Sequence, residues 1–227
     1  MLNVYFGSMS PSFAVRRFVG APGSAKFNEI IECFKQAYSE DHFARSVTGG
    51  KADIYHLLNY SVLLSGVLSG EVYIIEEVSN GNKVVAAAVW FPPNRELFEE
   101  SEQGKAAGPF MASLFPELGQ WWGTRFLPEY NDFAKTKFGE GVRKAAWHLQ
   151  WIGTLKPYRC RGLGTMLIDV IRDKKKDRKM CLEVEKPENL KFYRKCGFKA
   201  IDEEAQHFEC YNVHQEPGFV MWAMLSD

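Results

Sequence analysis

The chain has 227 residues, 46% of them hydrophobic, and this length and composition suit one soluble globular domain with its own core. Its 28 Lys and Arg balance 28 Asp and Glu, so no overall charge recruits nucleic acid or an anionic membrane, and no apolar run approaches the roughly 18 residues of a membrane span. The five cysteines form neither a CxxC pair nor a Cys/His spacing typical of zinc, which predicts reduced thiols in the cytoplasm, no disulfide framework and no metal site.

The first part of the sequence predicts strands, two helices and a hairpin. Ser24 follows a Pro-Gly break and is the expected N-cap of a helix that runs to about residue 38, because apolar residues recur there at three- and four-residue steps. The Asn80-Gly81 step is typical of a tight turn between two strands. Strands are expected over 14–19, 71–78 and 83–91, and a second helix over about 52–68.

The segment from about 92 to 144 differs in composition and is interpreted as an insertion over the substrate side of the domain. It mixes proline, glycine and charged residues, predicts short helices and contains no strand pattern. Its aromatic residues are either the wall of a ligand pocket or a seal that packs the insertion onto the domain. These residues are Trp121, Trp122, Phe126, Tyr130 and Phe133.

The remainder predicts an alternation of strands and helices. A strand, a helix and a strand in this order favour parallel pairing with a right-handed crossover, so we expect an α/β or α+β fold around a mixed sheet. Gly197 stands where a helix C-cap glycine belongs. The expected strands are 146–154, 180–185, 198–201 and 219–225, and the expected helices are 162–174 and 188–195.

The turn KPYRCRGLGTML, residues 156–167, joins one of these strands to the next helix. The first N–H groups of a helix have no backbone partner and attract an anion. Gly162 and Gly164 leave room for a phosphate to approach those groups, and Arg159 and Arg161 add charge-assisted donors. The turn matches neither a nucleoside-triphosphate loop nor a dinucleotide motif. It is therefore either a phosphate cradle or a basic turn that is only solvated.

Two stretches, IGTLKPYRCRGLGTMLID and LEVEKPENLKFYRKCGF, together resemble the GNAT superfamily of N-acetyltransferases. The resemblance is specific over residues 146–199, where the family has a strand, an R/Q-x-x-G-x-G/A loop and a later N-x-x-F-Y-x-x-x-G-F pattern. It implies a single GNAT-like domain over residues 1–227, with a mixed, twisted sheet of six to seven strands and helices on both faces. It also implies acetyl-CoA as co-substrate.

The resemblance assigns the coenzyme site to two adjoining segments. The loop would hold the diphosphate of coenzyme A through backbone N–H groups, and the backbone of the preceding strand would bond the thioester and the pantetheine arm. Many members have glycine where Cys160 stands, and this departure puts close packing of the diphosphate in question. The residues implied are Trp151, Ile152, Gly153, Thr154, Leu155, Arg159, Cys160, Arg161, Gly162, Leu163, Gly164 and Thr165.

The second stretch supplies two further matches. Tyr193 matches a tyrosine that returns a proton to the departing thiolate, a step that a nearby phenol can perform. Asn189 matches an asparagine beside the pantetheine arm. Each residue also has a structural interpretation, Tyr193 as packing between helix and sheet and Asn189 as a polar residue in a first helical turn.

Candidates for the general base come from two neighbouring strands. Glu183 and Glu185 are two residues apart, so their side chains share one face of a strand, and Glu185 lies closer to the end where ligands of α/β folds bind. His148 is a further candidate, although a lone histidine beside tryptophans is often a structural group. His148, Trp121, Trp122 and Tyr130 are also expected to contact the acceptor.

The reaction implied by the resemblance is direct transfer of an acetyl group from acetyl-CoA to the amine of a small molecule within a ternary complex. The FYRKCGF motif and the AAAVWFPP strand ahead of a long insertion look most like puromycin-acetyltransferase-like members. Two alternatives remain open: acetylation of a protein N-terminus or lysine, and binding of acyl-CoA without turnover. A monomer and a homodimer are both compatible with the sequence.

Overall fold

A computed structural model describes residues 12–99, 101–212 and 218–227 of the chain. Within these residues eight strands join into one mixed sheet. The strands are β1 (Phe13–Phe18), β2 (Glu71–Glu77), β3 (Lys83–Phe91), β4 (Trp147–Thr154), β5 (Met180–Val184), β6 (Lys199–Ala200), β7 (Gln206–Phe208) and β8 (Phe219–Ser226). Their order is β1-β2-β3-β4-β5-β8-β6, and β7 pairs with β8. The predicted mixed sheet is confirmed, with β7 as a strand beyond those expected.

The first four strands pair antiparallel in sequence order. The predicted hairpin between β2 and β3 is confirmed, with the short 3₁₀ turn η1 (Val78–Asn80) at its tip. The positive φ angles of this turn fall on Gly81 and Asn82, one position later than Asn80-Gly81. Every residue of β3 after Lys83 is buried, because both faces of this strand are covered.

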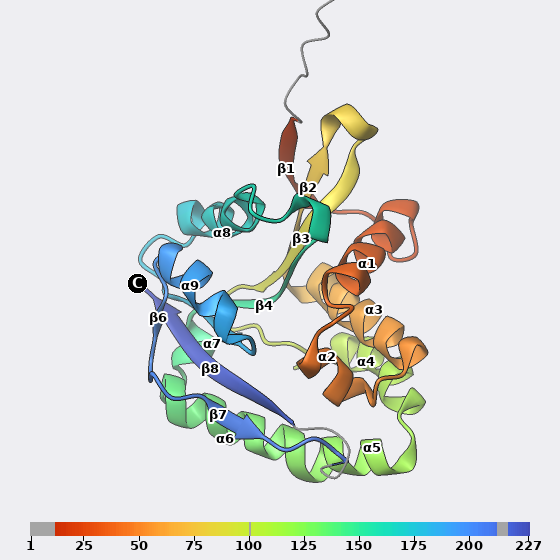
Figure 1. Cartoon of the computed structure of the whole chain (residues 1–227), viewed down its shortest axis with the longest axis vertical. Helices are drawn as coiled ribbons and strands as arrows, with labels where there is room; N and C mark the ends of the chain where they lie inside the picture. The colour runs from red at the N-terminus through yellow and green to blue at the C-terminus, as the bar shows by residue number, and fades with distance from the viewer. Residues whose placement is uncertain (1–11, 100, 213–217) are drawn as a thin grey trace, which may run out of the picture.

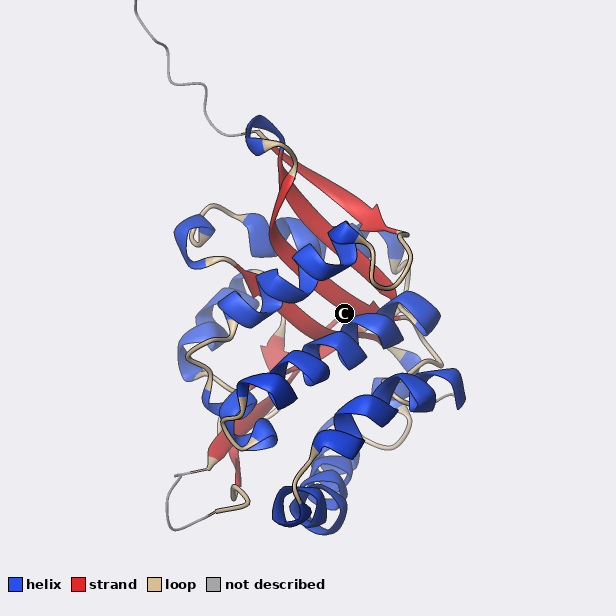
Figure 2. Ribbon diagram, turned by 90° about the vertical axis from the view of Figure 1, so that its right-hand side faces the viewer, coloured by secondary structure: helices blue, strands red, loops and turns tan. Residues whose placement is uncertain are grey.

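Helices cover the two faces of the sheet unequally (Figure 1). On one face lie α1 (Ala25–Ala37), α2 (His42–Thr48) and α3 (Ala52–Ser69), and Figure 2 looks onto this side. On the other face lie α8 (Leu163–Lys174) and α9 (Pro187–Lys195). Each face buries its own apolar core against the sheet. The prediction of helices on both faces is confirmed.

The first helix begins as predicted, because the Ser24 hydroxyl accepts a hydrogen bond from the N–H of Phe27. Its five buried apolar side chains follow the expected spacing. Helix α2 was not predicted: it has only seven residues, and Asp41 caps it by accepting from the N–H of Ala44.

The segment between β3 and β4 is helical and covers the same face as α1 and α3. It contains α4 (Ser101–Ser113), α5 (Pro116–Trp121), the π-helical turn η2 (Trp122–Phe126), α6 (Leu127–Phe138) and α7 (Val142–Ala145). Helix α4 packs on α3, and α6 packs on β8. We call residues 92–146 the helical segment. No helix among the described residues is long and apolar enough to cross a membrane.

The predicted parallel unit β4-α8-β5 is present, but its two strands stay together over only three residues each. The pairs run from Trp147 with Met180 to Leu149 with Leu182. The register of β4 on β3 shifts at Gln150, so this residue forms a bulge. Beyond Leu149, β4 and β5 no longer pair with each other, although each keeps its pairing on its other side. The sheet therefore opens between these two strands.

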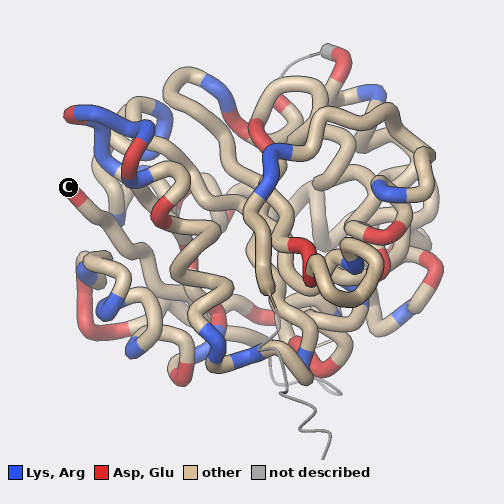
Figure 3. The backbone as a smooth tube through the Cα atoms, turned by 90° about the horizontal axis from the view of Figure 1, so that it is seen from above, with Lys and Arg blue, Asp and Glu red and all other residues tan. Residues whose placement is uncertain are grey.

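The C-terminal part returns the chain to the sheet. Gly197 has a φ of 82° directly after α9, as expected for the glycine that ends a helix. Strand β8 then pairs antiparallel with β5 from Met180 opposite Ser226 to Val184 opposite Trp222. Charged residues of both signs are interspersed along the chain in Figure 3, in keeping with the zero net charge.

Candidate active site

A cavity of about 690 Å³ lies where β4 and β5 separate. It extends from the end of α1, along the end of β4, past the turn before α8, to the end of β5 and one side of α9. Its size falls within the range of small-molecule sites. We call this cavity the cleft. Among the residues that border it are Tyr38, Ile152, Thr154, Gly164, Glu185, Asn189 and Tyr193.

The turn before α8 presents uncapped helix N–H groups to the cleft. Gly162 is the N-cap in a left-handed conformation, with φ 78°, and no described side chain caps the helix. The first N–H groups of α8 therefore remain available to an anion. Cys160 is also left-handed, with φ 60°, a conformation that glycine adopts with less strain. This backbone conformation is a physical reason why a glycine would be less strained at position 160 than Cys160 is.

The two glycines of the turn serve different purposes. A Cβ on Gly162 would meet no atom within 4 Å, so only the positive φ favours glycine there. A Cβ on Gly164 would lie 2.9 Å from the ring of Phe192, so glycine at 164 lets α9 pack closely on the start of α8. The sequence predicts only that both glycines admit a phosphate, and the packing role of Gly164 depends on its contact with α9.

The two arginines of the turn also differ. Arg159 donates from Nε to the carbonyl oxygen of Thr154 at 3.2 Å and from Nη2 to that of Ala37 at 2.9 Å. It thereby ties the end of β4 to the end of α1. The guanidinium of Arg161 lies over the ring of Tyr158, 5.3 Å from its centroid. Of the two side chains, Arg161 is the one not held by β4 and α1.

Tyr193 projects from α9 and borders the cleft. It is 8% exposed and packs edge-on against Phe192 and Phe198. Burial, reinforced by the nearby Glu185 carboxylate, raises the pKa of the Tyr193 hydroxyl above its ordinary value, so the phenol keeps its proton. Tyr193 is thus packed between helix and sheet, as one of its two sequence interpretations expects, and it also borders the cleft. Asn189 is exposed at the rim of the cleft.

Glu183 belongs to a buried polar cluster. Its Oε2 lies 2.7 Å from Nε2 of His148, and its Oε1 lies 3.6 Å from Nη1 of Arg143. Burial opposes ionisation, but the contacts with His148 and Arg143 prevail and lower the pKa of Glu183. Arg143 also donates to the hydroxyl of Tyr130 and pairs with Glu96. Glu183 is thus an ionised carboxylate already engaged by its neighbours.

Glu185, one residue beyond the end of β5, has the opposite electrostatic environment. It borders the cleft, and burial together with the negative charges of Asp41 and Glu183 raises its pKa well above the ordinary value. Two carboxyl groups whose environments push their pKa values apart take different roles in proton transfer. Of the two carboxylates that the sequence offered, Glu185 is the one that borders the cleft.

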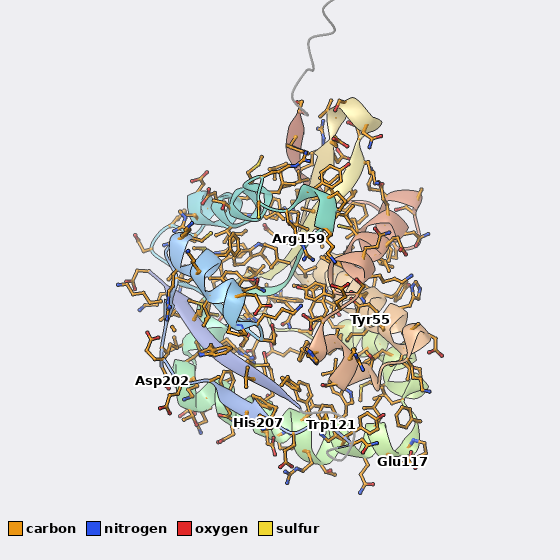
Figure 4. All side chains as sticks on the ribbon, in the orientation of Figure 1. Tyr55, Glu117, Trp121, Arg159, Asp202 and His207 are labelled. Carbon is orange, nitrogen blue, oxygen red and sulfur yellow. The ribbon has the colours of Figure 1, made fainter. Side chains whose placement is uncertain are left out.

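The tryptophans of the helical segment do not border the cleft. Trp121 donates from Nε1 to the carbonyl oxygen of Glu209, and Trp122 donates to that of Val47, at 3.0 and 2.8 Å. Both are buried in the core on this side of the sheet. Figure 4 shows Trp121 among the lower helices, well separated from Arg159. These contacts favour the sealing role of the two that the sequence left open.

Several residues of the site were not identified from the sequence. Tyr38 was assigned to the apolar face of α1, yet it borders the cleft. Arg143, which links Glu183, Tyr130 and Glu96, lies in a segment without a recognisable motif. Neither role has a local signal, because both depend on contacts between distant parts of the chain. Among the described residues no group of three His, Cys, Asp or Glu side chains is placed to hold a metal ion.

A mixed sheet that opens between parallel β4 and β5, with an uncapped α8 at the opening, is the GNAT fold. Residues 128–200, less than half of the chain, match the family model described as "Acetyltransferase (GNAT) domain". A GNAT acetyltransferase domain is therefore detected over the part of the chain that runs from α6 through β4, the turn, α8 and β5 to α9 and β6. No curated protein sequence matches the chain.

Solved structures with this fold extend over nearly the whole chain. Arylalkylamine N-acetyltransferase 2 of Aedes aegypti has a TM-score of 0.61 at 13% identity, covering 94% of this chain and 98% of its own. Polyamine N-acetyltransferase of Drosophila melanogaster, which forms N-acetylagmatine, has a TM-score of 0.57 at 15% identity, covering 94% and 99%. A Corynebacterium glutamicum protein described as "histone acetyltransferase HPA2 and related acetyltransferase" has a TM-score of 0.57 at 16% identity, covering 96% of each chain. At identities this low the likeness shows the fold alone.

Proposed function

We propose that the protein transfers an acetyl group from acetyl-CoA to the amine of a small molecule, by direct attack within a ternary complex. The observation that carries the proposal is the cleft itself. One cavity joins an uncapped helix N-terminus to an opened sheet, and it is bordered by one carboxyl group with a raised pKa and one protonated phenol. These are the parts that anion binding and two proton transfers require.

The described residues fit coenzyme A. The N–H groups at the start of α8 suit its diphosphate. The volume of about 690 Å³ extends from this turn to Tyr193 and Glu185, which leaves room for an arm between the phosphates and the reacting end. When bound, acetyl-CoA supplies an acyl group activated as a thioester.

Glu185 accepts a proton from the attacking amine in this proposal. A carboxyl group with a raised pKa is a stronger base than an ordinary glutamate, and it lies closer to the operating pH of the reaction. Glu183 is held by His148 and Arg143, so its negative charge remains fixed nearby and helps to keep the pKa of Glu185 high. Glu183 therefore acts through Glu185 as a positioning residue.

Tyr193 returns a proton to the departing thiolate. Its hydroxyl stays protonated near neutral pH, and the phenol is a poorer acid while Glu185 is ionised. Once Glu185 has taken a proton from the amine, that negative charge is neutralised, and Tyr193 donates more readily. Each turnover thus adds a proton to Glu185 and removes one from Tyr193, and return of that proton from Glu185 to Tyr193 restores both groups.

A small-molecule amine is the acceptor class that we infer. The fold is shared with enzymes described as acting on arylalkylamines, agmatine and polyamines. Within the GNAT superfamily, the FYRKCGF motif and the AAAVWFPP strand favour puromycin-acetyltransferase-like members. The five cysteines, all among the described residues, form no disulfide, which is compatible with the cytoplasmic location expected from the sequence.

Thiol release tests the proposal directly. The chain is incubated with acetyl-CoA and a panel of arylalkylamines, polyamines, amino sugars and nucleoside amines, with a set of lysine peptides alongside. We expect release of coenzyme A with at least one small amine and acetylation of that amine by mass spectrometry. Turnover of peptides alone would assign a protein acceptor, and binding of acetyl-CoA without turnover of any amine would contradict the enzymatic proposal.

A further inference from the structure

Tyr38 occupies the exposed edge of β4 inside the cleft. It lies directly after α1 and is held there by its own N–H, which donates to the carbonyl oxygen of Phe34. Its hydroxyl donates to the carbonyl oxygen of Ile152 at 2.6 Å and accepts from the N–H of the same residue at 3.2 Å. Its ring packs on Trp151, with 5.0 Å between centroids. One side chain thus satisfies both backbone groups of Ile152.

The position of Ile152 explains why such a partner is needed. Pairing with β5 ends at Leu149, so Ile152 has no neighbouring strand on that side. Two residues later, the carbonyl oxygen of Thr154 accepts from Arg159. Side chains from α1 and from the turn therefore replace the missing strand along the open edge, where unpaired backbone groups inside the protein would be costly.

A hydroxyl that donates one hydrogen bond and accepts another imitates one peptide group of an adjacent strand. An extended ligand with an amide group offers the same donor and acceptor to an open strand edge. The arm of coenzyme A contains amide groups of this kind. The amide and the Tyr38 hydroxyl cannot both bond the N–H and the carbonyl oxygen of Ile152.

We propose that Tyr38 is a displaceable cap of the β4 edge, and that the amide-containing arm of the acyl donor takes its place at Ile152. This inference rests on the proposed function, because it assumes that the acyl donor lies in the cleft. Tyr38 sets the affinity for the arm: each binding event replaces two existing hydrogen bonds and does not simply add two new ones.

The chain provides space for the displaced side chain. Tyr38 also borders a second cavity, of about 550 Å³, that lies among α1, α2 and α3. Tyr38 therefore borders both open volumes. In this proposal Tyr38 rotates toward the second cavity and releases Ile152.

Replacement of Tyr38 by phenylalanine is the variant that tests the cap. It removes the hydroxyl and keeps the ring on Trp151. The matched control is Tyr55→Phe: Tyr55, labelled in Figure 4, also borders the second cavity, and its hydroxyl donates to the carbonyl oxygen of Phe34 without touching β4. Calorimetric titration with two probes, coenzyme A and adenosine 3′,5′-bisphosphate, separates the arm from the nucleotide end.

The expected result is that Tyr38→Phe binds coenzyme A about 3- to 10-fold more tightly than the parent, the scale of one net hydrogen bond that the ligand no longer has to break. Adenosine 3′,5′-bisphosphate, which has no arm, should bind the parent, Tyr38→Phe and Tyr55→Phe equally. Tyr55→Phe should bind coenzyme A as the parent does.

Amide hydrogen exchange at Ile152 gives an independent measurement. In the free parent this N–H is protected by Tyr38, and in Tyr38→Phe it should exchange faster. Saturating coenzyme A should restore its protection in the variant, because the arm takes over the bond. Unchanged protection in free Tyr38→Phe, or no recovery with coenzyme A, would overturn the cap.

The binding results distinguish the cap from the proposed function. Equal or weaker affinity of Tyr38→Phe for coenzyme A, with binding of the parent intact, would overturn the cap alone. Absence of coenzyme A binding in the parent as well as in both variants would overturn the proposed function and the cap with it.

Discussion

Replacement of Glu185 by glutamine removes a proton acceptor from the cleft and keeps the size and shape of the side chain. Glu185 borders the cleft, and its pKa is raised well above the ordinary value by burial, by Asp41 and by Glu183. If this carboxylate takes the proton from the amine, its loss removes general-base catalysis, which typically contributes 10²- to 10⁴-fold in rate. We expect Glu185→Gln to lower kcat by about that factor and to leave the Kd for coenzyme A unchanged.

The pH dependence follows from the same shift. Because the base form of Glu185 is populated only as the pH rises through its raised pKa, kcat/KM of the parent should increase with pH along a limb that Glu185→Gln lacks. A folded-state pKa above the unfolded value of about 4.3 also means that the neutral carboxyl contributes stability at low pH, and that this contribution is lost as the pH rises through the folded pKa. The variant should therefore unfold at the same or higher denaturant concentration than the parent at neutral pH, despite its lower activity.

Steady-state rates of thiol release between pH 5.5 and 9, with the chemical step shown to limit turnover, provide the assay. Glu204→Gln is the control, because Glu204 is exposed and does not border the cleft. A Glu185→Gln variant with near-parental kcat and an unchanged pH limb would refute the assignment of Glu185 as the base. Loss of stability together with activity would indicate a structural role.

The other predictions concern proton return and the two sets of buried contacts. Tyr193→Phe should keep the fold and the Kd for coenzyme A but lower kcat about 10²- to 10⁴-fold, and near-parental turnover would leave proton return to water. Trp122→Phe leaves the buried carbonyl of Val47 without its donor, so it should lower the free energy of unfolding, measured in urea, by about 1 to 3 kcal/mol. KM for the acceptor should not change, and a raised KM would indicate that Trp122 contacts the acceptor. Arg143→Met leaves Glu183 as a buried charge without its cationic neighbour and should lower the free energy of unfolding by about 3 to 5 kcal/mol. Adding Glu183→Gln to this variant should recover part of that loss, and additive destabilisation by the two substitutions would contradict their coupling.

Elements with strong local signals were predictable from the sequence. Ser24 caps α1 as expected, the apolar run of β3 forms a central strand, and Gly197 ends α9. The turn between β4 and α8 was located correctly because its glycines and arginines stand between a clear strand and a clear helix. Helix α2 was missed, since seven residues carry too little periodicity to outweigh their polar composition.

The site was predictable only in part, because much of it depends on tertiary contacts. The sequence predicted Glu183 and Glu185 on one face of a strand, but the opposite shifts of their pKa values arise from His148, Arg143 and Asp41, which come from other elements. Tyr38 looked like one more apolar residue of α1, and its bonds to Ile152 span more than a hundred residues of sequence. No local sequence pattern indicates that a tyrosine hydroxyl will bond the backbone groups that a neighbouring strand would otherwise bond.

A crystal structure of the chain with coenzyme A would test the central claim most directly. We expect the diphosphate at the N–H groups that begin α8, the arm along β4 at Ile152, and the sulfur next to Tyr193 and Glu185. Coenzyme A bound in the second cavity among α1, α2 and α3, or bound with its phosphates away from the start of α8, would contradict it.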